Sequence, residues 1–312
     1  MELRPKNIYK MLIHRGLKTL LEKNCLATIS TEKNKTPEAA IFRLNEIYNI
    51  NAKAQTDVDP SFAGEYHLLN LLTDRLNITN GFVIDIAASD GCTQSCTLGF
   101  FRREGWSGLA VEMNPIKFSK LSFIYAVFPN AKLARCRVTP GNIKPLLDSF
   151  EVPKDISVIN LDIDSYDLYV IEEMLKANYK PRLISMEINE KIPAGIFFTV
   201  EFNDKHYWQN DHFFGCSIDA ACSVVKPFGY ILYKMEYNNA IFIRDDLISN
   251  NFTDLTPENA YNLGYKSRPN RKELFPWNAD VEQWLHSTVD DSVVLIREYF
   301  KKYEGNFKLS KV

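Results

Sequence analysis

Acidic and amide side chains follow two apolar segments in the middle of the chain. Asp162 and Asp164 come directly after one segment (157–161), and Glu187 and Asn189 follow the next apolar run (183–186). If both segments are strands of one open sheet, these groups meet at its carboxyl edge. Carboxylates so close repel one another unless one holds a proton or a cation binds. Oxygen ligands favour Mg²⁺, Mn²⁺ or Ca²⁺, so we expect a divalent cation (Mg or Mn) held by Asp162, Asp164, Glu187 and Asn189.

Such a cation would act as a Lewis acid on a substrate hydroxyl. Asp162 is therefore a candidate catalytic residue as well as a metal ligand. Asp167 follows closely in the chain and has two open interpretations: it joins the acidic group, or it caps the helix that begins there.

A second pattern lies upstream, in the segment Phe82-Val-Ile-Asp-Ile-Ala-Ala-Ser-Asp-Gly91. Apolar residues lead into Asp85, small residues follow at Ala87 and Ser89, and Gly91 precedes an apolar-periodic stretch, which indicates a strand, a turn and a helix. The next predicted strand, 108–112, ends in Glu112. In doubly wound sheets, an acid at this place binds the ribose of an adenosine cofactor.

The turn lacks the G-x-G-x-x-G pattern of dinucleotide-binding proteins. Asp85 and Asp90 would repel a pyrophosphate, whereas they suit an ammonium group and ribose hydroxyls. These residues favour S-adenosylmethionine over NAD as the cofactor. The alternative is an ordinary buried turn that binds nothing.

A third segment, 203–217, is dense in aromatic and polar residues and holds two of the five histidines, His206 and His212. Long loops near strand ends often cover a site. We expect residues 203–215 to form a mobile lid over the acceptor, with His206 or His212 as a catalytic base, because histidine titrates near neutral pH. A loop histidine that serves only as a hydrogen-bonding residue is the alternative.

Alternating strand and helix patterns must position these residues. They predict an α/β fold with a doubly wound, mainly parallel seven-stranded sheet, because strands that alternate with helices of this length are covered on both faces. The expected strands are 82–86, 108–112, 131–136, 156–161, 182–187, 228–234 and 239–244, the last two forming an antiparallel hairpin. The expected helices are 6–24, 62–76, 93–104, 115–126, 142–149, 167–177 and 279–303.

Composition narrows the class of protein. The 312 residues, 46% hydrophobic, are enough for a large core, and the net charge of −2 gives no general attraction to nucleic acid. No apolar run is long enough to span a membrane and no signal peptide is evident at Met1, so we expect a cytoplasmic location. The six cysteines lack the spacing of a zinc finger and are expected to be reduced. We divide the chain into a helical extension (1–60), a cofactor-binding domain (61–246) and a C-terminal extension (247–312).

Residues 60–245 resemble the class I S-adenosylmethionine-dependent methyltransferases, a Rossmann-like fold, and among them the FkbM-like group. The matching motifs are Val83-Ile-Asp-Ile-Ala-Ala-Ser-Asp-Gly91, Trp106-Ser-Gly-Leu-Ala-Val-Glu-Met-Asn-Pro115, Asn160-Leu-Asp-Ile-Asp164, Gly229-Tyr230, Asn239-Ala-Ile-Phe242 and Gly64-Glu65. The resemblance implies cofactor contacts from Glu65, Asp85, Ala87, Ser89, Gly91, Glu112, Met113 and Asp162. The departure from the group is the turn itself, which reads Ala-Ala-Ser-Asp-Gly instead of being rich in glycine.

Residues 160–245 also resemble a bacterial group of uncharacterised methyltransferase-like proteins with the pattern Asp-Ile-Asp-x-x-Asp, Glu-x-Asn and Phe-Gly-x-Ser. Asp162, Glu187 and Asn189 stand approximately where metal-dependent O-methyltransferases hold their cation. These resemblances imply transfer of a methyl group to a hydroxyl of a sugar or glycoconjugate, with a small molecule or glycan as acceptor. The alternatives are a nucleotide-using enzyme and an inactive relative that serves as a binding or assembly module, since the segments 1–60 and 250–312 could build a homo-oligomer interface.

Overall fold

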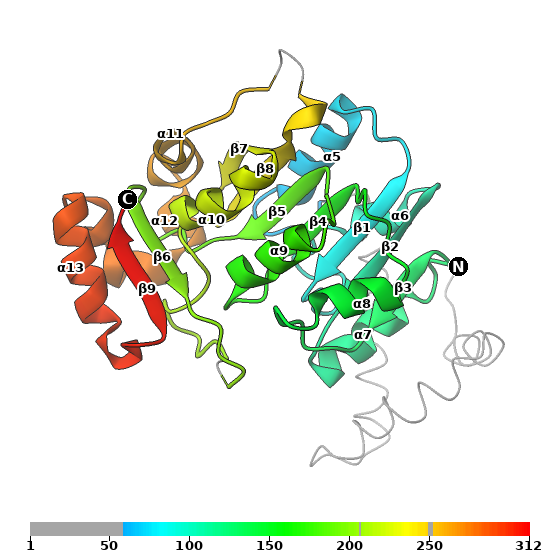
Figure 1. The fold of residues 1–312 in the computed structure, drawn as a ribbon, viewed down its shortest axis with the longest axis horizontal. Helices are drawn as coiled ribbons and strands as arrows, with labels where there is room; N and C mark the ends of the chain where they lie inside the picture. Colours follow the sequence, from blue (N-terminus) through cyan, green and yellow to red (C-terminus); the bar gives the residue numbers. More distant parts are fainter. Residues whose placement is uncertain (1–58, 206, 249–251) are drawn as a thin grey trace.

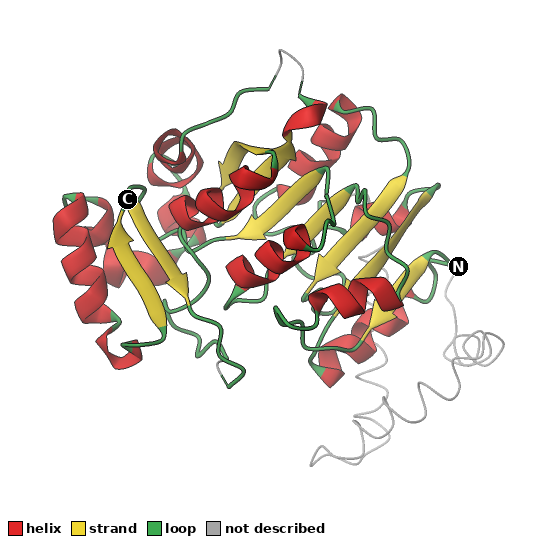
Figure 2. Ribbon diagram, viewed as in Figure 1, coloured by secondary structure: helices red, strands yellow, loops and turns green. Residues whose placement is uncertain are grey.

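The computed structural model describes residues 59–205, 207–248 and 252–312 of the chain. Its main body is a seven-stranded sheet in the order β3-β2-β1-β4-β5-β8-β7, with helices on both faces (Figures 1 and 2). Strands β1 to β5 run parallel, and β8 lies antiparallel between β5 and β7. The predicted doubly wound α/β sheet and its terminal hairpin are confirmed.

All seven predicted strands are present, with ends that differ by a few residues from the prediction. The strands of the main sheet are β1 (Gly81–Ile86), β2 (Trp106–Val111), β3 (Ala131–Ala134), β4 (Val158–Leu161), β5 (Leu183–Glu187), β7 (Tyr230–Glu236) and β8 (Asn239–Arg244). The helices of this part are α5 (Glu65–Arg75), α6 (Leu98–Arg102), α7 (Pro115–Tyr125), α8 (Ile143–Ser149), α9 (Asp167–Lys176) and α10 (Ile218–Val225), the last followed by a short 3-10 turn, η2 (Lys226–Phe228).

Alternating side chains divide the core into two layers. Val83 of β1 packs with the apolar residues of α5, α6 and α7 on one face of the sheet. Ile84 and Ile86 of the same strand pack with α8, α9 and α10 on the other face. Because successive strand residues point to opposite faces, a nearly continuous apolar run is what a sheet covered on both sides requires.

The predicted helix 93–104 is wrong in its first turn, since α6 begins only at Leu98. Side-chain hydrogen bonds to the backbone keep the residues before Leu98 in turns instead of a helix. Asp90 Oδ1 accepts hydrogen bonds from the backbone N–H groups of Cys92 (3.0 Å) and Thr93 (2.7 Å). Ser95 Oγ accepts a hydrogen bond from the N–H of Leu98 at 3.0 Å. Aspartate and serine side chains compete with helical hydrogen bonds in this way, which keeps residues 93–95 in a loop beside the cavity described below.

The C-terminal residues fold mainly as short helices: η3 (Asp245–Leu247), α11 (Pro257–Tyr261), η4 (Asn262–Lys266), α12 (Arg271–Leu274), η5 (Pro276–Leu285), α13 (Val289–Tyr299) and η6 (Lys301–Tyr303). The predicted helix 279–303 is therefore split between η5, α13 and η6. The split occurs at Thr288, whose hydroxyl accepts a hydrogen bond from the N–H of Asp291 at 3.2 Å and caps α13.

The sequence patterns did not reveal a second, two-stranded sheet. Strand β6 (Ile196–Val200) pairs antiparallel with β9 (Phe307–Lys311), so it joins the segment after β5 to the C-terminal extension (Figure 1). Phe198, Phe213, Phe300 and Phe307 pack against one another beneath this pair. The two ends of the 201–214 loop are joined next to this sheet, because Val200 N–H donates a hydrogen bond to Gly215 O at 3.0 Å.

The predicted helix 6–24 and most of the first extension lie outside the described residues. Within the described part of the chain, no helix combines the length and the apolar character needed to cross a membrane. Cys92, Cys96, Cys136, Cys216 and Cys222 form no disulfide, as the sequence predicts for them.

Candidate active site

The carboxyl ends of β1, β2, β3 and β4 surround a cavity of about 460 Å³. This is the edge of the sheet at which open α/β folds bind ligands. Six of the predicted site residues line it: Asp85, Ala87, Ser89, Glu112, Met113, Asp162, and with them the predicted metal ligand Asp164. The remaining lining residues include Thr93, Gln94, Ser95, Lys117, Cys136, Arg137, Val138, Asn160, Ser165, Tyr166, Tyr207 and Trp208.

Glu112 stands directly after β2, as predicted, and its carboxylate is fixed by two backbone groups. Oε2 accepts a hydrogen bond from the N–H of Ser89 at 2.9 Å, and Oε1 accepts one from the N–H of Asn114 at 2.6 Å. Each carboxylate oxygen can accept further hydrogen bonds. Glu112 therefore presents a preorganised acceptor pair to the cavity.

Asp85 ends β1 and is almost fully buried, with 2% of its surface exposed. Its two oxygens are occupied, because Thr97 Oγ1 donates to Oδ2 at 2.6 Å and Asn160 Nδ2 donates to Oδ1 at 3.1 Å. Burial raises the pKa of Asp85 above its usual value, and the nearby Glu112 carboxylate acts in the same direction. Asp85 orders the floor of the cavity and also keeps β1, β4 and the 93–97 loop together.

The turn after β1 has left-handed backbone at residues that are not glycine. Ala87 has φ 65°, Ser89 has φ 53° and Gln94 has φ 56°, and all three line the cavity. Such conformations cost about 1–2 kcal/mol for residues with a Cβ. Strain of this kind concentrates at functional sites. Ala87 and Ser89 thus hold left-handed backbone without being glycine.

Gly91 has a different place from the one predicted. It is absent from the cavity lining and has φ +77°. A Cβ there would lie 2.5 Å from Leu121 Cδ1 and 2.6 Å from Tyr125 Cε1. The glycine allows α7 to pack against the turn. Glu65 is likewise absent from the lining; it is buried at the start of α5, and its Oε2 accepts a hydrogen bond from Ala63 N–H at 2.8 Å.

Three of the four predicted metal ligands converge. Asp162, Asp164 and Glu187 each offer a carboxylate oxygen, and these oxygens lie within 4.8 Å of one another. Glu187 is 6% exposed; its Oε1 accepts a hydrogen bond from Asn238 Nδ2 at 3.1 Å, and its Oε2 has no hydrogen-bond partner within the described ranges. We call Asp162, Asp164 and Glu187 the acidic trio.

The acidic trio is electrostatically unfavourable by itself. Burial raises the pKa of Asp162 well above its usual value, and the charges of Asp164 and Asp167 raise it further. Burial and the Asp162 charge do the same to the pKa of Glu187. Lys117 and Lys191 partly offset the raised pKa of Asp164. A proton or a bound cation would relieve the repulsion between the carboxylates of the trio.

Asp167 lies behind the trio and orders the turn that carries it. Its carboxylate accepts hydrogen bonds from the backbone N–H groups of Ile163 (2.8 Å) and Ser165 (3.0 Å). Burial raises the pKa of Asp167 to about 6. Asp167 therefore holds the loop before α9. The cap interpretation is wrong, because Asp167 is the first residue of α9, the N-cap is Tyr166, and no side chain caps the helix.

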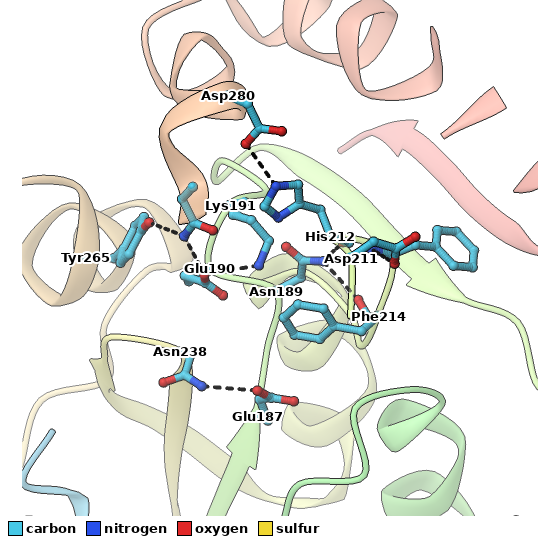
Figure 3. A network of polar contacts seen from close by, with 12 residues as sticks. Glu187, Asn189, Glu190, Lys191, Asp211, His212, Phe214, Asn238, Tyr265 and Asp280 are labelled. Carbon is cyan, nitrogen blue, oxygen red and sulfur yellow. Dashed lines mark hydrogen bonds and ion pairs between the residues drawn. The ribbon is translucent and has the colours of Figure 1, made fainter. Parts of the chain in front are cut away.

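Asn189 and His212 belong to a separate polar network beyond the trio (Figure 3). Asn189 Nδ2 donates to the carbonyl oxygens of His212 and Phe214, both at 2.9 Å, so the amide braces the loop. His212 Nε2 contacts Asp280 Oδ1 at 3.0 Å, and burial lowers the pKa of the imidazole. Glu187 and His212 lie on opposite sides of Asn189 in Figure 3, and His212 is absent from the cavity lining.

The same network contains a buried lysine that the sequence patterns do not single out. Lys191 is 1% exposed, and its Nζ lies 3.1 Å from Glu190 Oε1 (Figure 3) and 4.2 Å from the Phe214 ring centroid. Asn278 Nδ2 also donates to Glu190 Oε1, at 2.7 Å. The ammonium adds positive charge behind Asp164. The other predicted base, His206, lies outside the described residues.

Comparison with known proteins found no matching family model and no matching curated protein. Among solved structures, the O-methyltransferase from Bacillus cereus in complex with SAH aligns with a TM-score of 0.40 at 14% identity, over 70% of this chain and 93% of that one. The N-terminal domain of EvdMO1 in the presence of SAH and D-fucose aligns with a TM-score of 0.38 at 10% identity, over 60% and 82%. A SAM dependent methyltransferase from Aquifex aeolicus aligns with a TM-score of 0.35 at 11% identity, over 62% and 95%. At such low similarity, the function proposed below depends on the residues of the site.

Proposed function

We propose that the protein is an S-adenosylmethionine-dependent O-methyltransferase that acts, with a divalent cation, on a hydroxyl of a sugar or glycoconjugate. The observation that carries this proposal is that one cavity is lined both by Glu112 and by two members of the acidic trio, Asp162 and Asp164. A ribose-binding acid and a hydroxyl-activating group must share one space for methyl transfer, because the reacting atoms have to be held in near contact.

The residues of the cavity fit the cofactor. Glu112 would accept hydrogen bonds from the ribose hydroxyls, and the small side chains of Ala87 and Ser89 allow close approach to the backbone. Asn160 and Ser165 line the cavity, and Asn160 Oδ1 and Ser165 Oγ are buried atoms with no hydrogen-bond partner among the described residues. Buried polar atoms left without partners are costly, which supports a ligand that satisfies them.

The reaction requires the acceptor oxygen to form a bond with the methyl carbon while the carbon–sulfur bond breaks, which leaves S-adenosylhomocysteine. The hydroxyl proton must go to a base. Asp162 is the better placed candidate, since its side chain lines the cavity. His212 is less well placed, because it is absent from the cavity lining.

The acidic trio fits Mg²⁺ or Mn²⁺, which prefer carboxylate oxygens. Glu187 supports this fit, since its Oε2 is buried and unpartnered within the described ranges. A bound cation supplies positive charge that lowers the pKa of an acceptor hydroxyl. In this proposal residues 61–246 bind the cofactor, and 247–312 support the acceptor side of the cavity through β9.

The test is calorimetric titration of the full chain with S-adenosylmethionine and with S-adenosylhomocysteine, each with and without Mg²⁺. We expect both to bind without Mg²⁺, and we expect turnover with a sugar acceptor only with Mg²⁺. Binding of neither compound would refute the enzyme assignment. Binding without any turnover on a broad panel of hydroxyl acceptors would favour the inactive binding module instead.

A further inference from the structure

Two aromatic side chains form part of the cavity wall although they come from a distant loop. Tyr207 and Trp208 lie in the segment after β6 and line the same cavity as Asp162 and Asp164. Tyr207 is 50% exposed and Trp208 is 40% exposed. Large aromatic faces left open beside reactive carboxylates offer a flat apolar surface to a ring.

Arg137 holds this loop from the other side of the cavity. The residue follows β3, and its guanidinium carbon lies 4.7 Å from the Tyr207 ring centroid and 5.7 Å from the Tyr166 ring centroid. Its Nε donates to Tyr166 Oη at 3.1 Å, and its Nη1 donates to the carbonyl oxygen of Asp204. The side chain therefore connects the end of β3 to the loop after β6, and cation–π contacts of this kind keep the tyrosine ring in place.

Trp208 is held by contacts within its own loop. Its Nε1 donates to the carbonyl oxygen of Asp211 at 2.7 Å, and its ring centroid lies 6.3 Å from that of Phe214. Phe214 in turn packs under Lys191. The indole lines the cavity that Asp162 and Asp164 also line, and the neighbouring Tyr207 contacts Arg137.

We propose that Trp208 and Tyr207 form the wall against which the sugar ring of the acceptor packs, and that Arg137 is the positioning residue that holds this wall across the cavity. The inference rests on the proposed function, since it names the place of the acceptor in that reaction. The C–H face of a pyranose is apolar and packs on aromatic rings, while its hydroxyls at the rim reach the acidic trio.

The experiment compares Arg137→Met and Trp208→Ala with Arg135→Met, a control at an exposed arginine two residues away. Three measurements are made on the full chain: the S-adenosylhomocysteine affinity by calorimetry, hydrogen exchange of residues 202–211, and saturation-transfer NMR. The NMR probes are the methyl glycosides of glucose, galactose, mannose and rhamnose, with catechol as the aromatic comparison.

We expect at least one glycoside to bind the unaltered chain, and its affinity to fall about ten-fold in Trp208→Ala and in Arg137→Met. Exchange of 202–211 should quicken in Arg137→Met and stay unchanged in Arg135→Met, while the cofactor affinity stays within about three-fold in all three variants. A large loss of cofactor affinity in Trp208→Ala would place the wall against the adenine and overturn the proposal. Catechol binding without glycoside binding would overturn the sugar assignment.

Failure of this inference is distinguishable from failure of the proposed function. If S-adenosylhomocysteine does not bind the unaltered chain, the proposed function fails. If it binds, but neither glycosides nor catechol bind beside it, only the wall is refuted. Unchanged exchange of 202–211 in Arg137→Met would refute the positioning role of the arginine.

Discussion

The carboxylate of Glu112 accepts a hydrogen bond from the backbone N–H of Ser89 at 2.9 Å, which ties the end of β2 to the turn after β1. The acid that would bind the ribose is therefore also the group that fixes the turn beneath it. Neighbouring parallel strands make this possible, since Asp85 pairs with Ala110 and Ile86 with Val111. A ligand that binds Glu112 would therefore lie beside the turn after β1, at Ser89.

Glu112→Ala should weaken S-adenosylhomocysteine binding by about 1–3 kcal/mol, because a charge-assisted pair of hydrogen bonds is lost. Glu112→Gln should also weaken binding, because its NH₂ group would face one of the two backbone N–H groups that donate to Oε1 and Oε2. Calorimetric titration checks both, with the exposed Glu104→Ala as a control. Unchanged affinity in Glu112→Ala would remove the residue from the cofactor site.

Removal of one carboxylate from the acidic trio should abolish tight cation binding. We expect Asp162→Asn and Glu187→Gln each to lower Mn²⁺ affinity by at least about ten-fold, since ligand charge sets the affinity of such sites. Electron paramagnetic resonance of Mn²⁺ measures the free ion directly. The half-buried α9 residue Glu173 provides the matched control, Glu173→Gln. Equal Mn²⁺ binding in all three variants would show that the trio holds no cation.

The cation-free protein should lose stability as the pH rises. Burial raises the pKa values of Asp162 and Glu187 well above their usual range and that of Asp167 to about 6. The folded chain then binds more protons than the unfolded chain between the unfolded pKa values, about 4, and these raised values, so its free energy of unfolding falls across that window.

Thermal unfolding checks this expectation. The Tm of the cation-free chain should be higher at pH 5.5 than at pH 8, and Mn²⁺ should reduce the difference by binding the ionised trio. Glu187→Gln should also reduce it, because one titrating carboxyl is gone. A Tm that rises from pH 5.5 to pH 8 would contradict the buried, proton-holding trio.

Gly91→Ala should destabilise the fold by about 1–3 kcal/mol through both backbone strain and overpacking. Gly305 offers a comparison, since it has φ +84° and nothing within 4 Å of an added Cβ, so Gly305→Ala reports the backbone cost alone. Urea unfolding of the two variants separates the effect of backbone strain from that of overpacking. If Gly91→Ala lowers the free energy of unfolding no more than Gly305→Ala does, then contact of the added Cβ with Leu121 and Tyr125 does not destabilise the fold.

The main sheet could be predicted because its strands are buried on both faces and therefore appear as apolar runs. Glu112, Asp162 and Asp164 were predictable for the same reason, since each follows such a run. The position of Gly91 was not, because spacing within a tight turn does not tell which residues face a ligand and which face a helix.

Other parts depend on contacts between distant segments. The segment Ile196–Val200 carries a strand pattern, yet its partner, Phe307–Lys311, lies more than a hundred residues away. The contacts of Arg137 with Tyr207 join two loops in the same way. The sequence predicted that the aromatic segment after residue 202 covers the site, but local patterns contain no information on pairings such as that of Arg137 with Tyr207, which became visible only in the structure.

The pairing of β6 with β9 has a consequence for the order of folding. The sheet that we propose to bind the cofactor consists of segments close in sequence, with short connections from β1 to β5, whereas the loop carrying Tyr207 and Trp208 starts from a strand whose partner is 307–311. Distant pairings form late because the loop-closure entropy must be overcome first. We therefore expect a nascent chain to acquire its nucleoside pocket before its acceptor wall, so that cofactor binding precedes catalytic competence during synthesis.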